Sequence, residues 1–343
     1  MRLARLLLVF AFLTGIFVPA LDMVLGMLPT GSTEKRSLAP FPSFGATPAR
    51  ELPARLDAWV RDHFGLRDAL IRAANRFRVK ALHSSPVKNV ILGRDGWLFY
   101  AAYGDGADIR DFLGHLPLAP AELAARKQTI EQRAATLAAH GVTYLFVVAP
   151  NKQTIYPDKT DLLRGPLRPV TRLDQLAAYL AREPRIPFLD LRATLAAARA
   201  ERDVYFRTDS HWNFYGGFLA FRAILDRLAA LRPDVPHVAA SDVEFVDRPA
   251  SGGDVAALLS MTDDWPDVTQ EWEWRGRTVA SPLRVVLLGD SFAEYVYPYF
   301  ELCFAYVNPI EQVQTGGFEL DRILAQRPDI VIEHHAERYL TAW

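Results

Sequence analysis

Apolar residues concentrate first in one block near the N-terminus. Residues 6–21 carry no charge, and after Asp22 the apolar run resumes and ends at Leu28. A helix needs about 20 apolar residues to cross a bilayer, so the whole block is long enough to do so. We therefore expect a signal anchor, a single transmembrane helix, at residues 1–28.

The residues around this block indicate its orientation and its main alternative. Arg2 and Arg5 precede the apolar run, and positive residues stay on the cytoplasmic side of a membrane helix. The rest of the chain is therefore expected to be exported. A cleaved signal peptide is the alternative, because Val18-Pro-Ala20 places small residues where a peptidase could cut.

Beyond a linker at residues 29–50, short apolar runs alternate with segments of helical periodicity. Near-continuous apolar runs, such as residues 142–149, are typical of strands buried on both faces of a sheet. The predicted helices cover residues 51–82, 120–140, 171–182, 192–202, 214–231 and 318–326. The predicted strands cover residues 90–100, with a turn at Asp95-Gly96, then 142–149, 186–191, 204–207, 284–288, 303–307 and 329–333.

This alternation predicts the fold class and the domain organisation. We expect one α/β domain over residues 51–343, with a mostly parallel sheet covered by helices on both faces. Residues 232–280 break the alternation with prolines, acidic residues and tryptophans. We interpret them as an insertion, with a hairpin near residues 271–279.

The composition narrows the class of protein. The chain of 343 residues is 50% hydrophobic and carries 39 Lys and Arg against 40 Asp and Glu, a net charge of -1. It therefore lacks the basic excess expected of a nucleic-acid-binding protein, and it is too apolar to be disordered. A single cysteine, Cys303, excludes an intramolecular disulfide and a multi-cysteine metal site. We expect no metal and no organic cofactor.

Polar residues follow two of the predicted strands. Asp209 and His211 follow residues 204–207, and Ser291 follows residues 284–288. The carboxyl ends of parallel strands meet at one edge of a sheet, where active sites form. A serine becomes a nucleophile when an imidazole takes its proton and a carboxylate orients that imidazole. The sequence therefore offers a complete set for nucleophilic catalysis.

These residues also have simpler interpretations. Asp209 or Ser210 could cap the helix that follows, and Gly289-Asp-Ser291 is ordinary turn chemistry. Metal binding by Asp209 and His211 is a weaker alternative, because no further cysteines or closely spaced histidines accompany them.

Four stretches together resemble the AlgJ/AlgX-type alginate (exopolysaccharide) O-acetyltransferases, a family of the SGNH hydrolase-like superfamily. They are Gly93-Arg-Asp-Gly-Trp-Leu-Phe-Tyr100, Pro150-Asn-Lys152 with Tyr156-Pro157, Thr208-Asp-Ser-His-Trp-Asn213 and Gly289-Asp-Ser-Phe292. The segments Ser251-Gly-Gly-Asp254 and Glu337-Arg-Tyr-Leu340 are also similar to this family. Aspartate and histidine precede the serine, which is the order expected of this group.

The resemblance implies a flavodoxin-like fold and a role for each site residue. Ser291 would be the nucleophile, His211 the general base and Asp209 its orienting partner. Backbone or side-chain donors at Gly253 and Asn151 are candidates for the oxyanion hole. Their positions alone make Lys152 and Tyr297 candidate substrate-binding residues. Lys152, at a strand end, would contact an acidic sugar or form a surface ion pair, and Tyr297 would stack on a sugar ring or pack in the core.

The resemblance also implies a substrate, a partner and a location. An acetyl group would pass through an acetyl-serine to hydroxyls of an exported, alginate-like polysaccharide. Cytoplasmic acetyl-CoA cannot reach an exported domain, so a membrane-bound O-acyltransferase would supply the acetyl group. The expected location is the inner membrane, with the catalytic domain in the periplasm.

Two other functions stay open at this stage. The same triad would make a carbohydrate esterase or deacetylase if water were the acceptor, and the two activities differ in how well water is excluded. A non-catalytic, membrane-anchored subunit that binds polysaccharide is the other alternative.

Overall fold

The computed structural model describes residues 2–25, 37–101, 105–163, 169–276, 280–311 and 317–343. The chain divides into two compact units. The first comprises Met1–Val87 and Ala257–Met261, and the second comprises Lys88–Ala256 and Thr262–Trp343. Residues 51–87, which the sequence pattern joins to the catalytic domain, thus belong to the first unit. We call the second unit the catalytic unit.

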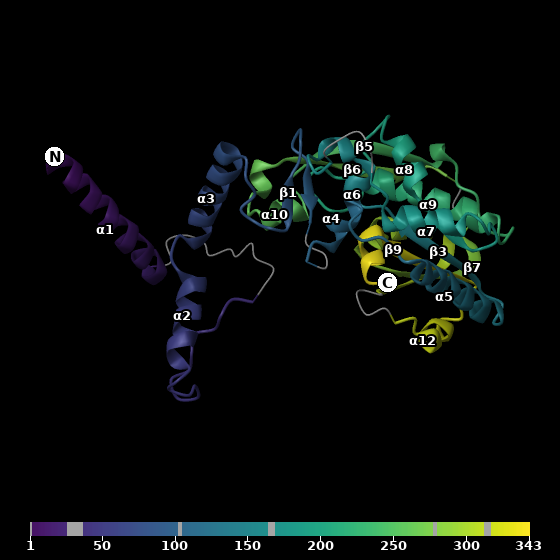
Figure 1. The fold of residues 1–343 in the computed structure, drawn as a ribbon, viewed down its shortest axis with the longest axis horizontal. Helices are drawn as coiled ribbons and strands as arrows, with labels where there is room; N and C mark the ends of the chain where they lie inside the picture. The colour runs from purple at the N-terminus through teal and green to yellow at the C-terminus, as the bar shows by residue number, and fades with distance from the viewer. Residues whose placement is uncertain (1, 26–36, 102–104, 164–168, 277–279, 312–316) are drawn as a thin grey trace. The chain divides into compact units, whose positions relative to one another are not determined.

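The described residues of Met1–Val87 in the first unit form the helices α1 (Arg2–Leu25), α2 (Leu52–His63) and α3 (Arg67–Leu82) (Figure 1). Within α1, residues Leu3–Met23 have a mean hydropathy of 2.2 and are long enough to cross a membrane by length and composition. Residues 26–28 of the predicted anchor, and residues 29–36 of the predicted linker, lie outside the described part of the chain.

The prediction of one helix over residues 51–82 is wrong, because the chain turns between α2 and α3. Leu66 has a φ of 61°, in the left-handed region. Gly65 lies so close to α1 that a Cβ there would be 2.0 Å from the carbonyl oxygen of Pro19. The apolar periodicity runs through this turn, so periodicity alone does not reveal it.

A five-stranded sheet forms the centre of the catalytic unit, and the predicted parallel α/β fold is confirmed. Every neighbouring pair is parallel, in the order β4-β3-β9-β7-β8. The strands are β3 (Thr143–Ala149), β4 (Phe188–Asp190), β7 (Ser281–Gly289), β8 (Phe304–Glu311) and β9 (Ile330–Ala336). Because β9 lies between β3 and β7, the carboxyl ends of these three strands adjoin one another.

Helices cover both faces of this sheet. Successive side chains of a strand point to opposite faces, so the strands contribute to two separate cores. Leu145 and Val147 of β3 pack into one core and Tyr144, Phe146 and Val148 into the other. The first core includes α8 (Arg192–Ala198), α9 (Phe214–Ala229) and α11 (Tyr297–Cys303). The second includes α5 (Pro120–Ala138), α7 (Arg172–Leu180) and α12 (Leu320–Ala325).

Two predicted elements differ from the structure. Residues 204–207 form no sheet strand, and only an isolated bridge joins Tyr205 to Trp212. We call residues 206–213 the base loop. In the insertion, β6 (Asp267–Trp274) pairs with β5 (Val243–Ala250) rather than with the residues that follow it. Residues 277–279 of the predicted hairpin lie outside the described residues.

The remaining elements are short. The hairpin of β1 (Val90–Leu92) and β2 (Leu98–Tyr100) confirms the predicted turn, with Asp95 and Gly96 both at positive φ. The short α-helices are α4 (Ala107–Phe112), α6 (Lys152–Ile155) and α10 (Asp254–Leu258). The 3-10 helices are η1 (Pro157–Lys159), η2 (Ala240–Asp242), η3 (Thr262–Asp264), η4 (Ser291–Tyr295) and η5 (Glu337–Thr341).

Candidate active site

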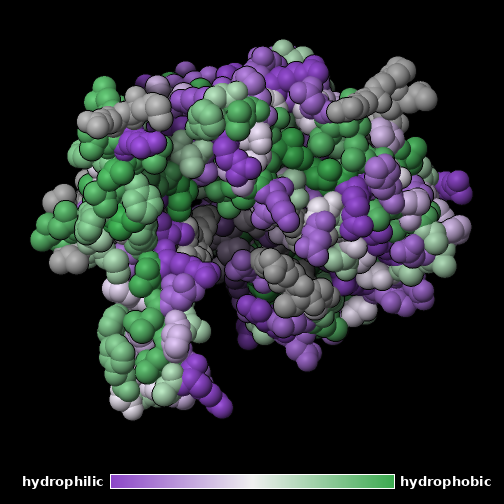
Figure 2. Space-filling view, turned by 60° about the vertical axis from the view of Figure 1, so that its left-hand side comes forward, coloured by the Kyte–Doolittle hydropathy of each residue, from purple (hydrophilic) through white to green (hydrophobic). Residues whose placement is uncertain are grey.

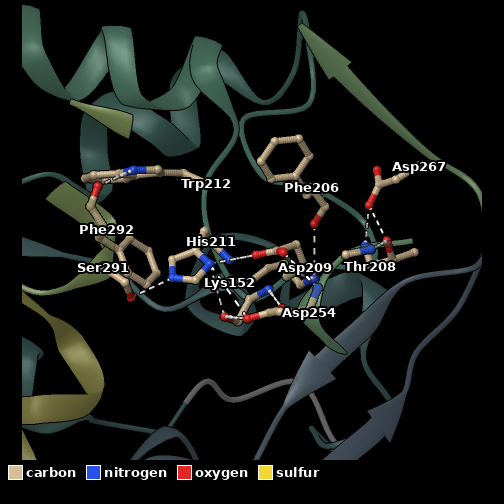
Figure 3. A network of polar contacts seen from close by, with 12 residues as sticks. Lys152, Phe206, Thr208, Asp209, His211, Trp212, Asp254, Asp267, Ser291 and Phe292 are labelled. Atoms are coloured by element: carbon tan, nitrogen blue, oxygen red, sulfur yellow. Dashed lines mark hydrogen bonds and ion pairs between the residues drawn. The ribbon is translucent and has the colours of Figure 1, made fainter. Parts of the chain in front are cut away.

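A continuous chain of hydrogen bonds joins the base loop to the end of β7 (Figure 3). Nδ1 of His211 lies 2.7 Å from Oδ1 of Asp209, and Nε2 of His211 lies 2.7 Å from Oγ of Ser291. A carboxylate only accepts, so the ring proton sits on Nδ1 and leaves Nε2 free to accept the serine proton. The structure thus brings together the three predicted catalytic residues in the order that proton transfer requires.

Ser291 is placed by the end of β7 and the start of η4. Asp290 caps this 3-10 helix, since its Oδ1 accepts the amide of Phe292 at 2.9 Å. Its other oxygen, Oδ2, accepts the amide of Ala336 at the end of β9, at 2.7 Å. One buried carboxylate therefore fixes the serine turn to the neighbouring central strand.

The cap of α9 decides between two interpretations of the base loop. Asn213 caps this helix, with Oδ1 accepting the amide of Gly216 at 2.9 Å. The capping alternative for Asp209 and Ser210 is therefore wrong. Trp212 connects the loop to the serine turn, since its indole N–H donates to the carbonyl of Phe292 at 3.0 Å.

The Asp209 carboxylate is held on both oxygens. Oδ1 also accepts the amide of His211 at 3.0 Å, and Oδ2 accepts the amide of Asp254 at 2.8 Å. Burial raises the pKa of Asp209, but the hydrogen bonds from His211 and from these amides outweigh it and lower the pKa to about 2. The carboxylate therefore stays ionised at neutral pH and can stabilise a protonated imidazole.

Asp254 is a second carboxylate that the sequence analysis did not select as a site residue. Its oxygens accept the amide and the hydroxyl of Ser210, each at 2.7 Å, and Oδ2 lies 3.8 Å from Nδ1 of His211. Asp254 ends the segment Ser251-Gly-Gly-Asp254. The similarity of that segment to the AlgJ/AlgX-type family was the one signal in the sequence that pointed to Asp254. Ligand atoms of Asp209, His211 and Asp254 lie within 4.8 Å of one another, as a metal site would need. All three residues also form hydrogen bonds with groups of the base loop, and these bonds orient His211 as a base would require.

Lys152 is not placed where it can touch a sugar, so the predicted contact is wrong. The side chain is 3% exposed, and its ammonium donates to the carbonyls of Phe206, Arg207 and Asp209 at 3.1, 3.0 and 2.7 Å. An ammonium has three N–H groups, and all three are used. Burial lowers the pKa of Lys152 to about 8. This buried ammonium therefore fixes the backbone of the base loop through its three hydrogen bonds.

The two oxyanion candidates also have partners. The amide of Gly253 donates to the hydroxyl of Thr208 at 2.8 Å, so this amide is not free to bind an oxyanion as predicted. The amide of Asn151 donates to Glu337 at 2.7 Å, which leaves the side-chain Nδ2 as its candidate donor. Burial raises the pKa of Glu337 to about 7.

Tyr297 lies at the site, as Ser291 and Tyr297 line the same cleft of about 300 Å³. Its hydroxyl donates to Glu301 at 2.7 Å, and burial and this neighbour raise its pKa to about 12. The cleft also has an apolar wall at Leu287, Pro309 and Ile310 and acidic side chains at Glu294 and Glu311. Ser291 therefore faces a space that is large enough for more than an acetyl group.

Known proteins are similar to this chain in sequence or in fold. The family model "SGNH hydrolase-like domain, acetyltransferase AlgX" matches residues 90–300. A probable alginate O-acetylase AlgJ from Pseudomonas putida is 29% identical over 143 residues, which are 41% of this chain and 34% of that protein. The match thus spans about one third of the length of this relative.

Two solved structures are similar to the chain. PatB1 from Bacillus cereus has a TM-score of 0.54 at 15% identity, over 74% of this chain and 97% of that one. The O-acetyltransferase domain of Pseudomonas putida AlgJ has a TM-score of 0.46 at 23% identity, over 74% of this chain and 92% of that one. At such identities the likeness of PatB1 shows the fold alone.

Proposed function

The chain belongs to the family of SGNH hydrolase-like acetyltransferases of the AlgX type, and from this premise we propose that it acetylates an exported polysaccharide. Ser291 is the nucleophile of the proposal, His211 the general base and Asp209 its orienting partner. The observation that carries the proposal is the unbroken path from Asp209 through His211 to Ser291, with 2.7 Å at each contact.

The first step transfers the acetyl group to the enzyme. Nε2 of His211 takes the proton of Ser291 as Oγ attacks the acetyl carbonyl carbon. The bond between Oγ and this carbon forms, the bond to the leaving group breaks, and the leaving group takes the proton from Nε2. Asp209 stabilises the imidazolium in between.

The second step transfers the acetyl group to the sugar. A hydroxyl of the polysaccharide gives its proton to Nε2 and attacks the acetyl-serine carbonyl carbon. The new ester forms, the bond to Oγ breaks, and Ser291 regains its proton. The amide of Ser291, at the start of η4, and Nδ2 of Asn151 are the proposed oxyanion donors, and one such donor typically lowers the barrier by about 2.7–4 kcal/mol.

The substrate, the donor partner and the location belong to the same proposal. The AlgJ relative, a probable alginate O-acetylase, supports an alginate-like acceptor. The apolar α1, with Arg2 and Arg5 at its start, supports an anchor in the inner membrane and a catalytic unit in the periplasm. A membrane-bound O-acyltransferase would then supply the acetyl group from the cytoplasm.

A trapping experiment tests the proposal. The full chain is incubated with an acetyl ester donor and a deacetylated polyuronate oligosaccharide, and the products are measured by mass spectrometry. We expect acetylated sugar, and an acetyl adduct on the peptide that contains Ser291 when the acceptor is omitted. Ser291→Ala is expected to abolish both signals, and Ser241→Ala, at an exposed serine of η2, is expected to keep both.

Three outcomes decide against parts of the proposal. Sugar acetylation by Ser291→Ala would remove Ser291 as the nucleophile. Release of acetate at every acceptor concentration, with no acetylated sugar, would make the protein an esterase. Binding of the oligosaccharide without any adduct or acetate would make it a polysaccharide-binding subunit.

A further inference from the structure

Helix α3 has an apolar face that its own unit leaves exposed. The face that packs inward includes Val79, which is 6% exposed, and Asn75, whose side chain donates to the carbonyl of Leu259 at 2.7 Å. Another face carries an apolar stripe at spacings of three and four residues, which aligns side chains along a helix. The stripe consists of Leu70, Ala74, Phe77 and Ala81, all of them exposed. Leu70 is 49% and Phe77 62% exposed.

Basic side chains border this stripe. By helical periodicity Lys80 lies along one side of it, and Arg67 and Arg78 lie along the other. The helix Arg67–Leu82 contains five basic residues in its sequence and one acidic residue, Asp68. An apolar stripe with cations on both sides is typical of helices that lie in the plane of a membrane surface.

The beginning of α3 is bound to the end of α1. The amide of Leu66, just before α3, donates to Oδ2 of Asp22 at 2.9 Å, and Asp22 is 4% exposed. The chain at Gly65 also lies against the carbonyl of Pro19. By length and composition α1 can cross a membrane, and Pro19 and Asp22 lie at the end away from Arg2 and Arg5. With α1 in a bilayer, α3 therefore starts at the bilayer surface.

We propose that α3 lies on the bilayer surface that α1 leaves, with its apolar stripe among the lipid chains and its cations on anionic lipid headgroups. Charge complementarity and the bond to α1 favour a lipid surface over a protein partner. Figure 2 turns the left-hand side of Figure 1 toward the viewer, and green hydrophobic residues lie beside purple hydrophilic residues on that side. The inference is independent of the proposed chemistry at Ser291 and needs only that α1 is retained.

Hydrogen exchange tests the proposal on the full chain. The protein is reconstituted in nanodiscs of phosphatidylcholine, and in nanodiscs where phosphatidylglycerol replaces part of that lipid. We expect the amides of residues 67–82 to exchange at least about tenfold more slowly on the anionic surface, since each of several cations gains from it. The double variant Leu70→Glu with Phe77→Glu is expected to abolish this protection, and glutamate keeps helix propensity.

Matched variants keep the test decisive. Val170→Glu changes an apolar residue of the catalytic unit that is 61% exposed, and it is expected to leave the lipid effect unchanged. The double variant Arg78→Gln with Lys80→Gln keeps the stripe and is expected to remove most of the difference between the two lipids. Equal exchange of residues 67–82 on both surfaces would overturn the proposal.

Discussion

The two halves of the candidate active site are held in different ways. The serine half lies at the end of a regular strand, and the cap that shapes it joins Asp290 to Phe292, two residues away. The base loop has almost no regular structure, and side chains from distant parts of the sequence hold its backbone. Lys152, Asp254 and Asp267 all bind groups of the loop, and Lys152 is 57 positions from Asp209.

The base loop therefore depends on residues far from it in the sequence more than the serine turn does. The position of Ser291 comes mainly with the sheet, because it directly follows β7 and the Asp290 carboxylate binds its turn to the neighbouring strand β9. The position of the base depends on a few polar contacts, so the loss of one contact leaves buried groups unpaired. Substitutions around the base loop should therefore reduce activity more than equivalent substitutions around the serine turn.

The largest expected effect is the loss of the orienting carboxylate. Asp209→Asn is expected to lower kcat by about 10⁴, because an amide can hold the imidazole in the wrong tautomer. Steady-state kinetics with an acetyl ester donor measures it. Asp263→Asn, at an exposed position of η3, is the control and should keep wild-type kinetics. A near wild-type kcat for Asp209→Asn would remove this residue from the mechanism.

Substitutions at two glycines, one beside the base loop and one at the serine turn, test the two halves of the site directly. A Cβ at Gly253 would lie 2.4 Å from Cβ of Asp209, whereas a Cβ at Gly289 would lie 3.0 Å from Cβ of Ala293. Gly253→Ala must displace Asp209, and such a shift is expected to lower kcat by about 10². Gly289→Ala is expected to lower kcat only a few-fold, since the serine turn has to move less. The reverse order in the same kinetic assay would contradict the comparison.

Lys152 tests whether the loop backbone needs its cation. Lys152→Met leaves three carbonyls without their donor, and we expect kcat to fall about tenfold with little change in KM. Lys152→Arg should restore part of kcat, because it restores the charge. Lys159→Met removes an exposed ion pair with Asp95 and serves as the control. A raised KM at constant kcat would instead indicate a substrate contact.

The last expected effect concerns stability near the serine turn and leaves activity at neutral pH unchanged. Neither ring nitrogen of His334 has a hydrogen-bond partner among the described residues, and burial lowers the pKa of His334 to about 4. The unfolded chain binds this proton below about pH 6.5 and the folded one only below about pH 4. Stability is therefore present above this window and falls as the pH drops through it.

Urea unfolding at two pH values measures this effect. We expect wild type to lose about 1–3 kcal/mol more than His334→Leu between neutral pH and the lower end of the window. His237→Leu is the matched control, because the side chain of His237 is 77% exposed. Parallel losses in wild type and His334→Leu would show that His334 does not contribute.

The sequence predicted some parts of the site and missed others for identifiable reasons. Asp209 and His211 are two positions apart, and Ser291 follows an apolar strand, so local patterns were enough to select them. Asp254 escaped selection because an acidic residue after two glycines has no periodic signature. Lys152 was selected for the wrong role, because its exposure depends on Trp97 and Phe99, whose rings lie 5.5 and 5.2 Å from its ammonium.

Sequence patterns were enough to predict the parallel α/β fold, the apolar N-terminal helix and the residue types at the strand ends. Each of these follows from periodicity or from neighbours in the chain, which backbone geometry converts directly into structure. Sequence patterns did not predict that Lys152 is buried, that the amide of Gly253 is already hydrogen-bonded or that the chain turns at Gly65. These outcomes depend on contacts between distant residues, such as Gly65 with Pro19, and no local pattern encodes which distant group will arrive.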